Sequence, residues 1–208
     1  MLELFISTFA TLFVVIDPVG CAPIYAGLTA NHSAKDARAT ALRASFIACI
    51  ILYTFALFGK GLLGALGIEL NAFRIAGGLM LFLIALEMVF EKRTEKDEER
   101  AEKVKHTPEP QEDVSVFPMA MPMIAGPGSI ATVMLMMSHA TNRMGALVVL
   151  AALTSVLMLT AAALLAAHPI MRLLGRRVEA VITRVLGVLL GALAVQYVID
   201  GVMGVLHH

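Results

Sequence analysis

Hydrophobic and polar positions fall into long blocks along this chain rather than into short amphipathic periods. Six stretches are apolar over about 20 residues, the length that a helix needs to cross the hydrocarbon core of a bilayer. One longer polar segment, Glu91 to Asp113, divides the six into two groups of three. We therefore predict an all-α membrane protein with six transmembrane helices, near Leu2–Leu28, Ala41–Leu66, Ile68–Phe90, Val116–Ser138, Met144–Ala167 and Val181–Leu206.

The composition supports this fold class and excludes several others. Of the 208 residues, 59% are hydrophobic and only 15% are charged, whereas about a quarter of a soluble domain is charged. The formal net charge of zero gives no basic surface for nucleic acid, so we expect no nucleic-acid partner. The cysteines, Cys21 and Cys49, have no metal-ligand spacing, and we expect neither a metal nor a cofactor.

The distribution of Lys and Arg predicts the orientation in the membrane. The turn after the first span, the loop after the third and the segment after the fifth hold most of these residues. The opposite side holds only Lys60, Arg74 and Arg143. Because basic residues gather in the cytoplasm, we expect both termini on the outer side of the cell (inner) membrane. Glu3 stands where a cleaved signal would be basic, so we expect the first span to be retained.

The two groups of spans resemble each other in sequence. We expect one membrane domain, 1–208, with repeat one at 1–90, a cytoplasmic loop at 91–115 and repeat two at 116–208. An Arg-x-x-Gly-x-Leu pattern starts at Arg74 and again at Arg184, and each group opens with a span that contains two prolines five residues apart. Since each half has an odd number of spans, the second enters the bilayer upside down. This predicts a 3+3 inverted repeat, an architecture of many secondary transporters and of some channels.

Helices 1 and 4 are predicted to be broken by Pro and Gly, at residues 17–23 and 122–129. Proline removes a backbone donor and glycine loosens the helix. Backbone groups freed at membrane depth need a polar cavity, because lipid offers no partners. The helix that restarts after each break presents a positive end that favours an anion, and carbonyl groups before the break suit an ammonium group or a cation. A zwitterion such as an α-amino acid fits, and so do other small polar metabolites.

Asp17 is the most informative side chain in these segments, because an ionisable residue inside a span is a functional candidate. It is a candidate site for the coupling ion, and it is equally suited to cap the helix that follows. For Ser129 and Thr132, ligand contact and hydrogen bonding to the preceding turn both remain open. The candidate substrate-binding residues are Asp17, Pro18, Gly20, Ala22, Pro23, Gly126, Pro127, Gly128, Ser129 and Thr132.

At these two segments the chain resembles the MarC family, also called the neutral amino acid transporter (SnatA-like) family. The similar stretches are Asp17 to Ile24, Pro118 to Ile130 and Arg74 to Gly78, and the resemblance extends over essentially the whole chain. It implies six spans and proton-coupled uptake of small neutral amino acids such as glycine and alanine. Family members often have Asn at the position of Asp17. Because Asn cannot carry a proton, this argues against an obligatory proton carrier there.

The sequence therefore predicts a secondary transporter of small neutral amino acids that works by alternating access around the two breaks. The alternatives are a transporter or exporter of another small polar solute, and a channel. An enzyme is not expected, because the spans show no paired carboxylates, no Ser/His pair and no metal spacing. The expected partners are a small neutral amino acid, a proton or sodium ion and the lipid bilayer, with a homo-oligomer left open.

Overall fold

The computed structural model describes residues 1–90, 99, 113–140 and 142–206, with the side chains of 171–177 and 179 left aside. These residues are helical throughout, apart from short connections. The predicted loop at 91–115 lies almost entirely outside the described residues. The helical segments are α1 (Leu2–Ile16), α2 (Pro18–Leu28), α3 (Ala34–Ala65), α4 (Leu70–Val89), η1 (Ser115–Ile124), α6 (Pro127–His139), α7 (Arg143–Leu165) and α8 (Ala167–Leu206).

The all-α membrane fold predicted from the hydrophobic blocks is confirmed. In the described part of the chain, five helices are long and apolar enough to cross a membrane. A sixth span results if η1 and α6, which meet at an angle of 51°, are counted together. In this count α1 and α2 form the first span, Leu2–Leu28, as predicted.

The predicted sixth span, Val181–Leu206, agrees with the candidate span Ala180–Leu206, whereas the start predicted for the second span is wrong. Helix α3 begins at Ala34 rather than Ala41, because the Ser33 hydroxyl accepts the Asp36 N–H at 3.1 Å and caps an earlier turn. Helix α8, which contains the sixth span, begins earlier, at Ala167, so the segment between the fifth and sixth spans is helical. Its proline, Pro169, lies in the first turn, where proline is tolerated, and the leucines and arginines that follow favour a helix.

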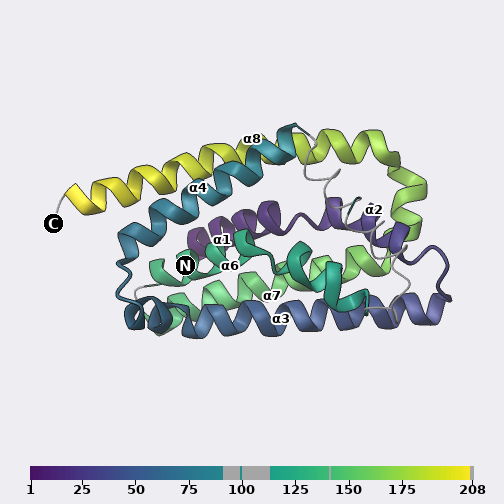
Figure 1. Ribbon diagram of the computed structural model, residues 1–208, viewed down its shortest axis with the longest axis horizontal. Helices are drawn as coiled ribbons and strands as arrows, with labels where there is room; N and C mark the ends of the chain where they lie inside the picture. The colour runs from purple at the N-terminus through teal and green to yellow at the C-terminus, as the bar shows by residue number, and fades with distance from the viewer. Residues whose placement is uncertain (91–98, 100–112, 141, 207–208) are drawn as a thin grey trace.

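The segments that contain the expected breaks form the centre of the molecule. In Figure 1, α1, α2 and α6 lie between α3 and α7 on one side and the pair α4 and α8 on the other. Half of the most apolar window of Leu2–Leu28 is buried, against 28% for α3, α4 and the C-terminal part of α8. Along α6, every residue from Gly128 to Met136 except Ile130 is buried. The chain therefore places its least regular helices where protein, rather than lipid, surrounds them.

Helices α4 and α8 pack closely through glycines on both partners. A Cβ added to Gly78 would lie 2.8 Å from the Ala194 carbonyl oxygen, and one on Gly187 would lie 2.8 Å from the Met88 Cβ. Small residues let helix backbones approach in a membrane, where packing replaces the hydrophobic effect as the driving force. The glycines of α8 thus serve contact within this chain.

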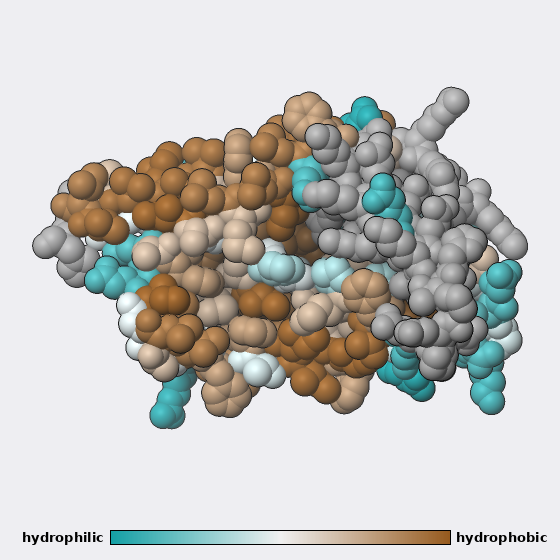
Figure 2. Space-filling view, viewed as in Figure 1, coloured by the Kyte–Doolittle hydropathy of each residue, from teal (hydrophilic) through white to brown (hydrophobic). Residues whose placement is uncertain are grey.

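The outer surface is apolar where lipid is expected. Large exposed side chains such as Phe46 and Phe58 on α3, Leu83 on α4 and Val188 on α8 are more than half exposed. Where Figure 2 is not covered by grey atoms, hydrophobic side chains make up most of the visible surface, and several strongly hydrophilic ones lie at its left and right ends. This is the surface of a protein whose middle zone contacts hydrocarbon.

The helices of the two halves run in opposite directions. In Figure 1, α1 and α2 run from left to right, whereas η1 and α6 run from right to left beside them. Likewise α3 opposes α7, and α4 opposes α8. The start of α1 and the end of α8 consequently point to the same end of the molecule, and the basic start of α3 lies at the other.

Candidate functional site

The first interruption is a single residue, Asp17, between α1 and α2. Its backbone is left-handed, with φ of 52°, a conformation that Asp and Asn adopt more readily than most residues. The Asp17 carboxylate accepts the Gly20 N–H at 3.0 Å and caps α2, with Pro18 in the first turn, as is typical of helix starts. A Cβ on Gly20 would lie 2.4 Å from Asp17 Oδ2, so glycine makes room for the cap.

The second interruption is longer and has no side-chain cap. Phe117 and Met121 are extended, as residues before proline prefer, so η1 is irregular throughout. The chain then leaves the helix at Ala125 and Gly126, and α6 starts at Pro127. A Cβ on Gly126 would lie 2.2 Å from the Pro122 carbonyl oxygen, so the chain can turn this tightly only with glycine there.

The two interruptions lie close together in space. A Cβ added to Gly128, in the first turn of α6, would come within 3.6 Å of Val15 Cγ1, two residues before Asp17. The same atom would lie 2.3 Å from Ile84 Cδ1 on α4. Segments that are more than 100 residues apart in sequence are therefore neighbours in the core, and the space between them is small.

The predicted site residues divide into buried groups and half-buried ones. Asp17, Pro18 and Ala22 are buried on the first segment, whereas Gly20 and Pro23 are half-buried. On the second segment Gly126, Gly128, Ser129 and Thr132 are buried, whereas Pro127 is exposed. The Thr132 hydroxyl donates to the Gly128 carbonyl at 2.8 Å, which is hydrogen bonding to the preceding turn, one of the two roles left open for it.

The electrostatics of the two helix starts differ. A helix N-terminus carries a partial positive charge, and at α2 the carboxylate of Asp17 already lies on it. At α6 the N-cap residue is Gly126, which has no side chain to cap the helix, and the residues of the first turn are proline, glycine and serine. The start of α6 is therefore the better position for the anionic group of a ligand.

Asp113, an acidic residue that lies just before η1 and outside the spans, has a lowered pKa. The hydroxyl and backbone N–H of Ser115 both bond to Asp113, at 2.6 and 3.1 Å. The Ser115 hydroxyl contributes most to holding the pKa of Asp113 below its usual value, and Arg43, 2.6 Å away, lowers it further. This contact ties the start of η1 to α3.

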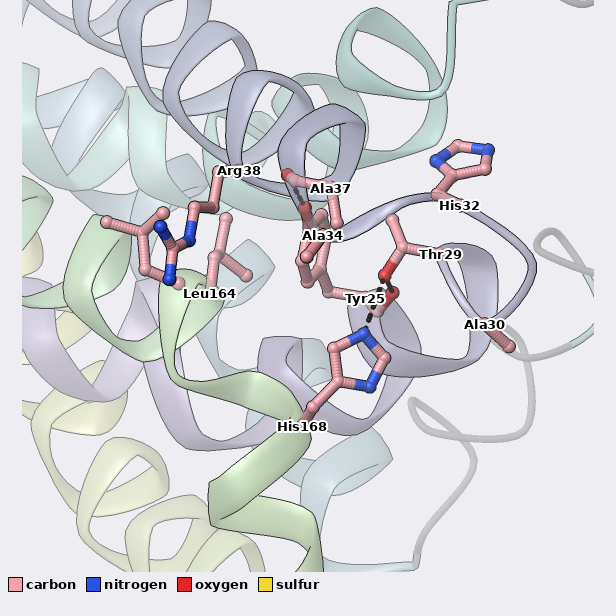
Figure 3. A pocket seen from close by; sticks show the side chains of 10 residues that line it. Tyr25, Thr29, Ala30, His32, Ala34, Ala37, Arg38, Leu164 and His168 are labelled. Carbon is pink, nitrogen blue, oxygen red and sulfur yellow. Dashed lines mark hydrogen bonds between the residues drawn. The ribbon is translucent and has the colours of Figure 1, made fainter.

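Sequence reasoning missed a cavity of about 300 Å³ at the basic end of the molecule. It lies between the end of α2, the start of α3 and the junction of α7 with α8 (Figure 3). None of the predicted site residues lines it; Tyr25, Thr29, Arg38 and His168 do. The sequence feature that could have indicated the cavity was His168, a polar residue directly after a span. A histidine in that position is equally typical of a membrane boundary.

Comparison with known proteins settles the family. The sequence model of the family described as "MarC family integral membrane protein" matches residues 2–206. The chain belongs to the MarC family. It is therefore an integral, multi-pass membrane protein, as its apolar helices indicate. The resemblance to the MarC family is confirmed, and the assignment to neutral amino acid transport stays a prediction.

Relatives of this MarC protein cover its whole length. A UPF0056 membrane protein of Methanocaldococcus jannaschii is 34% identical over 205 residues, which are 99% of this chain and 98% of the relative. One from Aquifex aeolicus is 34% identical over 209 residues, 99% of this chain and 95% of the relative. Both names state a membrane protein and no substrate. No solved structure matches the chain.

Proposed function

We propose that this MarC protein is a proton-coupled secondary transporter of small neutral amino acids such as glycine and alanine. Its substrate would bind between the two interruptions, at Asp17 and at the start of α6. The observation that carries the proposal is the proximity of two unlike helix starts, one with a carboxylate on it and one without a side-chain cap.

The unlike helix starts suit the two ends of a zwitterion. The substrate carboxylate would accept N–H groups in the first turn of α6, near Gly128 and Ser129, as anions do at helix N-termini. The ammonium group would lie towards Asp17 and the carbonyl groups of the last turn of α1. This modifies the expectation of two equivalent positive ends, because Asp17 already occupies the start of α2.

The narrow space at the interruptions favours a small substrate. A single added Cβ on Gly128 would meet side chains of both α1 and α4. Glycine and alanine demand the least additional volume of any amino acid. Even these substrates would require Ile84 to shift, and a large side chain would require α4 or α6 to move further away.

A 3+3 inverted repeat with broken helices 1 and 4 would provide the transport movement. The opposed directions of α1 and α2 against η1 and α6, of α3 against α7 and of α4 against α8 support it (Figure 1). So does the central position of the two interrupted segments. Movement of one repeat against the other would expose the site alternately to the two sides of the cell membrane.

Asp17 would couple substrate movement to protons. Its carboxyl group is buried and close to the proposed ammonium position. Binding of a proton to the carboxylate would therefore change its attraction for the substrate ammonium group. The same carboxyl group would serve as the cap of α2 and as the coupling site.

Uptake of labelled glycine and alanine into proteoliposomes, with and without an imposed pH gradient, tests the proposal. The native chain should show saturable uptake that the gradient drives, and Asp17→Asn should keep the fold but lose the dependence on the gradient. Uptake that does not saturate would indicate a channel. No uptake of either amino acid under any gradient would reject this substrate class and turn attention to other small polar solutes.

A further inference from the structure

The cavity at the basic end of the molecule is separate from the two interruptions and has its own chemistry. Its walls come from two regions that are far apart in sequence, the α2–α3 connection and the α7–α8 junction (Figure 3). Tyr25 and Thr29 belong to the end of α2, Arg38 to the first turns of α3, and His168 to the start of α8. Leu164 and Leu165, at the end of α7, form an apolar side of the cavity.

A chain of polar contacts joins three of the elements at the cavity. The Tyr25 hydroxyl donates to the Ala37 carbonyl, which ties α2 to α3. The Thr29 hydroxyl donates to the Tyr25 carbonyl at 2.8 Å. The Thr29 oxygen also lies 3.4 Å from His168 Nε2, a contact in which the donor depends on the tautomer of the ring. This contact holds the imidazole at the cavity wall.

The polar side chains at the cavity favour an anion. Arg38 and the imidazoles of His32 and His168 line it, and no carboxylate belongs to its lining in the described part of the chain. Among the residues that the structure describes, Arg38 has no ion-pair partner; the ion pair seen there joins Arg43 to Asp113. A cavity lined by an arginine and two imidazoles, with no carboxylate among its described lining residues, is suited to an oxyanion, which arginine binds through two parallel N–H groups.

We propose that this cavity binds the phosphate group of an anionic membrane lipid, with Arg38 and His168 as its principal contacts. The location favours a lipid over a soluble ligand. The cavity lies at the end where basic residues gather, and basic pockets between helices on that side of a membrane hold lipid head groups. Leu165 in its wall is 44% exposed, so the cavity adjoins the apolar surface on which acyl chains would lie.

The proposal does not depend on transport activity. A bound head group would join the α2–α3 connection to the α7–α8 junction, one from each half of the chain. Free inorganic phosphate offers the same oxygen atoms, so the experiment needs one arm for each source.

The test measures the thermal stability of the purified full chain in detergent with added phosphatidylglycerol. Phosphatidylcholine with the same acyl chains is the neutral comparison, and inorganic phosphate is the second arm. The variants are Arg38→Gln and His168→Ala. The matched control is Lys35→Gln, which removes the same charge from an exposed position on the same turn of α3 and does not line the cavity.

Phosphatidylglycerol should raise the Tm of the native chain and of Lys35→Gln with the same half-saturating concentration. Arg38→Gln should need about tenfold more lipid, the effect of losing one charged hydrogen bond, and His168→Ala should need several-fold more. Native mass spectrometry should show one retained lipid that Arg38→Gln loses, so the result does not rest on stability alone.

Three results would overturn the lipid proposal. The first is equal effects of Lys35→Gln and Arg38→Gln, which would mean unspecific attraction to the basic end. The second is an equal response to the two lipids. The third is an Arg38-dependent response to inorganic phosphate without one to phosphatidylglycerol, which would assign the cavity to a soluble anion.

Discussion

Both interruptions break a helix in the centre of the molecule, but they differ in what shapes the start of the next helix. Between α1 and α2 the chain departs from the helix for one residue, and the Asp17 side chain compensates by capping the next helix. Between η1 and α6 the irregularity extends over most of η1 and ends in a bend of 51°. There the backbone itself makes the turn, and no side chain caps α6.

The difference indicates a division of roles. The first interruption supplies a charged side chain, and its geometry depends on that side chain. The second supplies bare backbone at a helix start, and its geometry depends on glycine. Substitutions should therefore act through chemistry at the first interruption and through sterics at the second.

Gly126→Ala should have the largest effect. The new Cβ would lie 2.2 Å from the Pro122 carbonyl oxygen, and because that neighbour is backbone, the bend itself must shift. We expect a loss near the upper end of the 1–3 kcal/mol that overpacking typically costs, measured as a fall in Tm together with loss of uptake.

Gly27→Ala provides the control for Gly126→Ala. Nothing lies within 4 Å of a Cβ at Gly27 on α2, so this variant should be neutral or slightly more stable, since alanine favours a helix. Equal stability of Gly126→Ala and Gly27→Ala would show that the second interruption does not depend on glycine.

Asp17→Ala should come second in size, and Asp17→Asn should be mild. Alanine loses the cap, which is worth about 1 kcal/mol, and tolerates the positive φ poorly, at a cost of about 1 kcal/mol more. Asparagine keeps both features. Thermal unfolding of the two variants separates capping from charge; if both unfold alike, the cap contributes nothing to the first interruption.

The hydroxyl groups of Ser129 and Thr132 should differ in function although both are buried. Thr132 already donates to the Gly128 carbonyl, so Thr132→Val should leave uptake unchanged. Ser129 lies in the first turn of α6, and Ser129→Ala should raise KM for glycine by about two- to tenfold, the worth of one hydrogen bond. A rise in KM in Thr132→Val alone would reverse the assignment.

The smallest effect should appear in acid at the start of η1. Since the folded pKa of Asp113 is lowered, its contribution to stability is present above the ordinary Asp pKa of about 3.9 and is lost as the pH falls through the lower folded value. Ser115→Ala removes the main cause and should reduce this acid-dependent loss. The change will be small because the Asp113 side chain is 41% exposed, and Tm measured between about pH 6 and pH 3 would detect it.

The spans could be predicted from the sequence because lipid imposes a strong rule. A helix exposed to hydrocarbon must be apolar over its whole length, and this leaves long blocks such as Leu70–Val89 and Arg143–Leu165. The family could also be inferred, because Asp17-Pro18 and Gly126-Pro127-Gly128 are unusual inside apolar helices. The starts of α3 and α8 could not, since polar helical turns beyond the membrane leave no hydropathy signal.

The unlike character of the two interruptions was hidden for a different reason. Both segments show prolines and glycines at similar spacing, so the sequence favoured two equivalent helix starts. The sequence offered capping as one of two roles for Asp17, and the bond from the Gly20 N–H to its carboxylate shows that the cap forms. The N-cap residue of α6 is Gly126, which has no side chain to do the same. The cavity of Tyr25, Thr29 and His168 was missed because residues more than 100 positions apart form it.

Substrate protection of a cysteine at the start of α6 tests the central claim most directly. Ser129→Cys would be placed in a chain that carries Cys21→Ala and Cys49→Ala and labelled with a membrane-permeant maleimide, with Ser155→Cys on α7 as the control. We predict that alanine slows labelling at Ser129 several-fold, with half-effect at the concentration that half-saturates uptake, and leaves Ser155 unaffected. Unchanged labelling of Ser129→Cys at saturating alanine, in a variant that still transports it, would contradict a substrate site between the two interruptions.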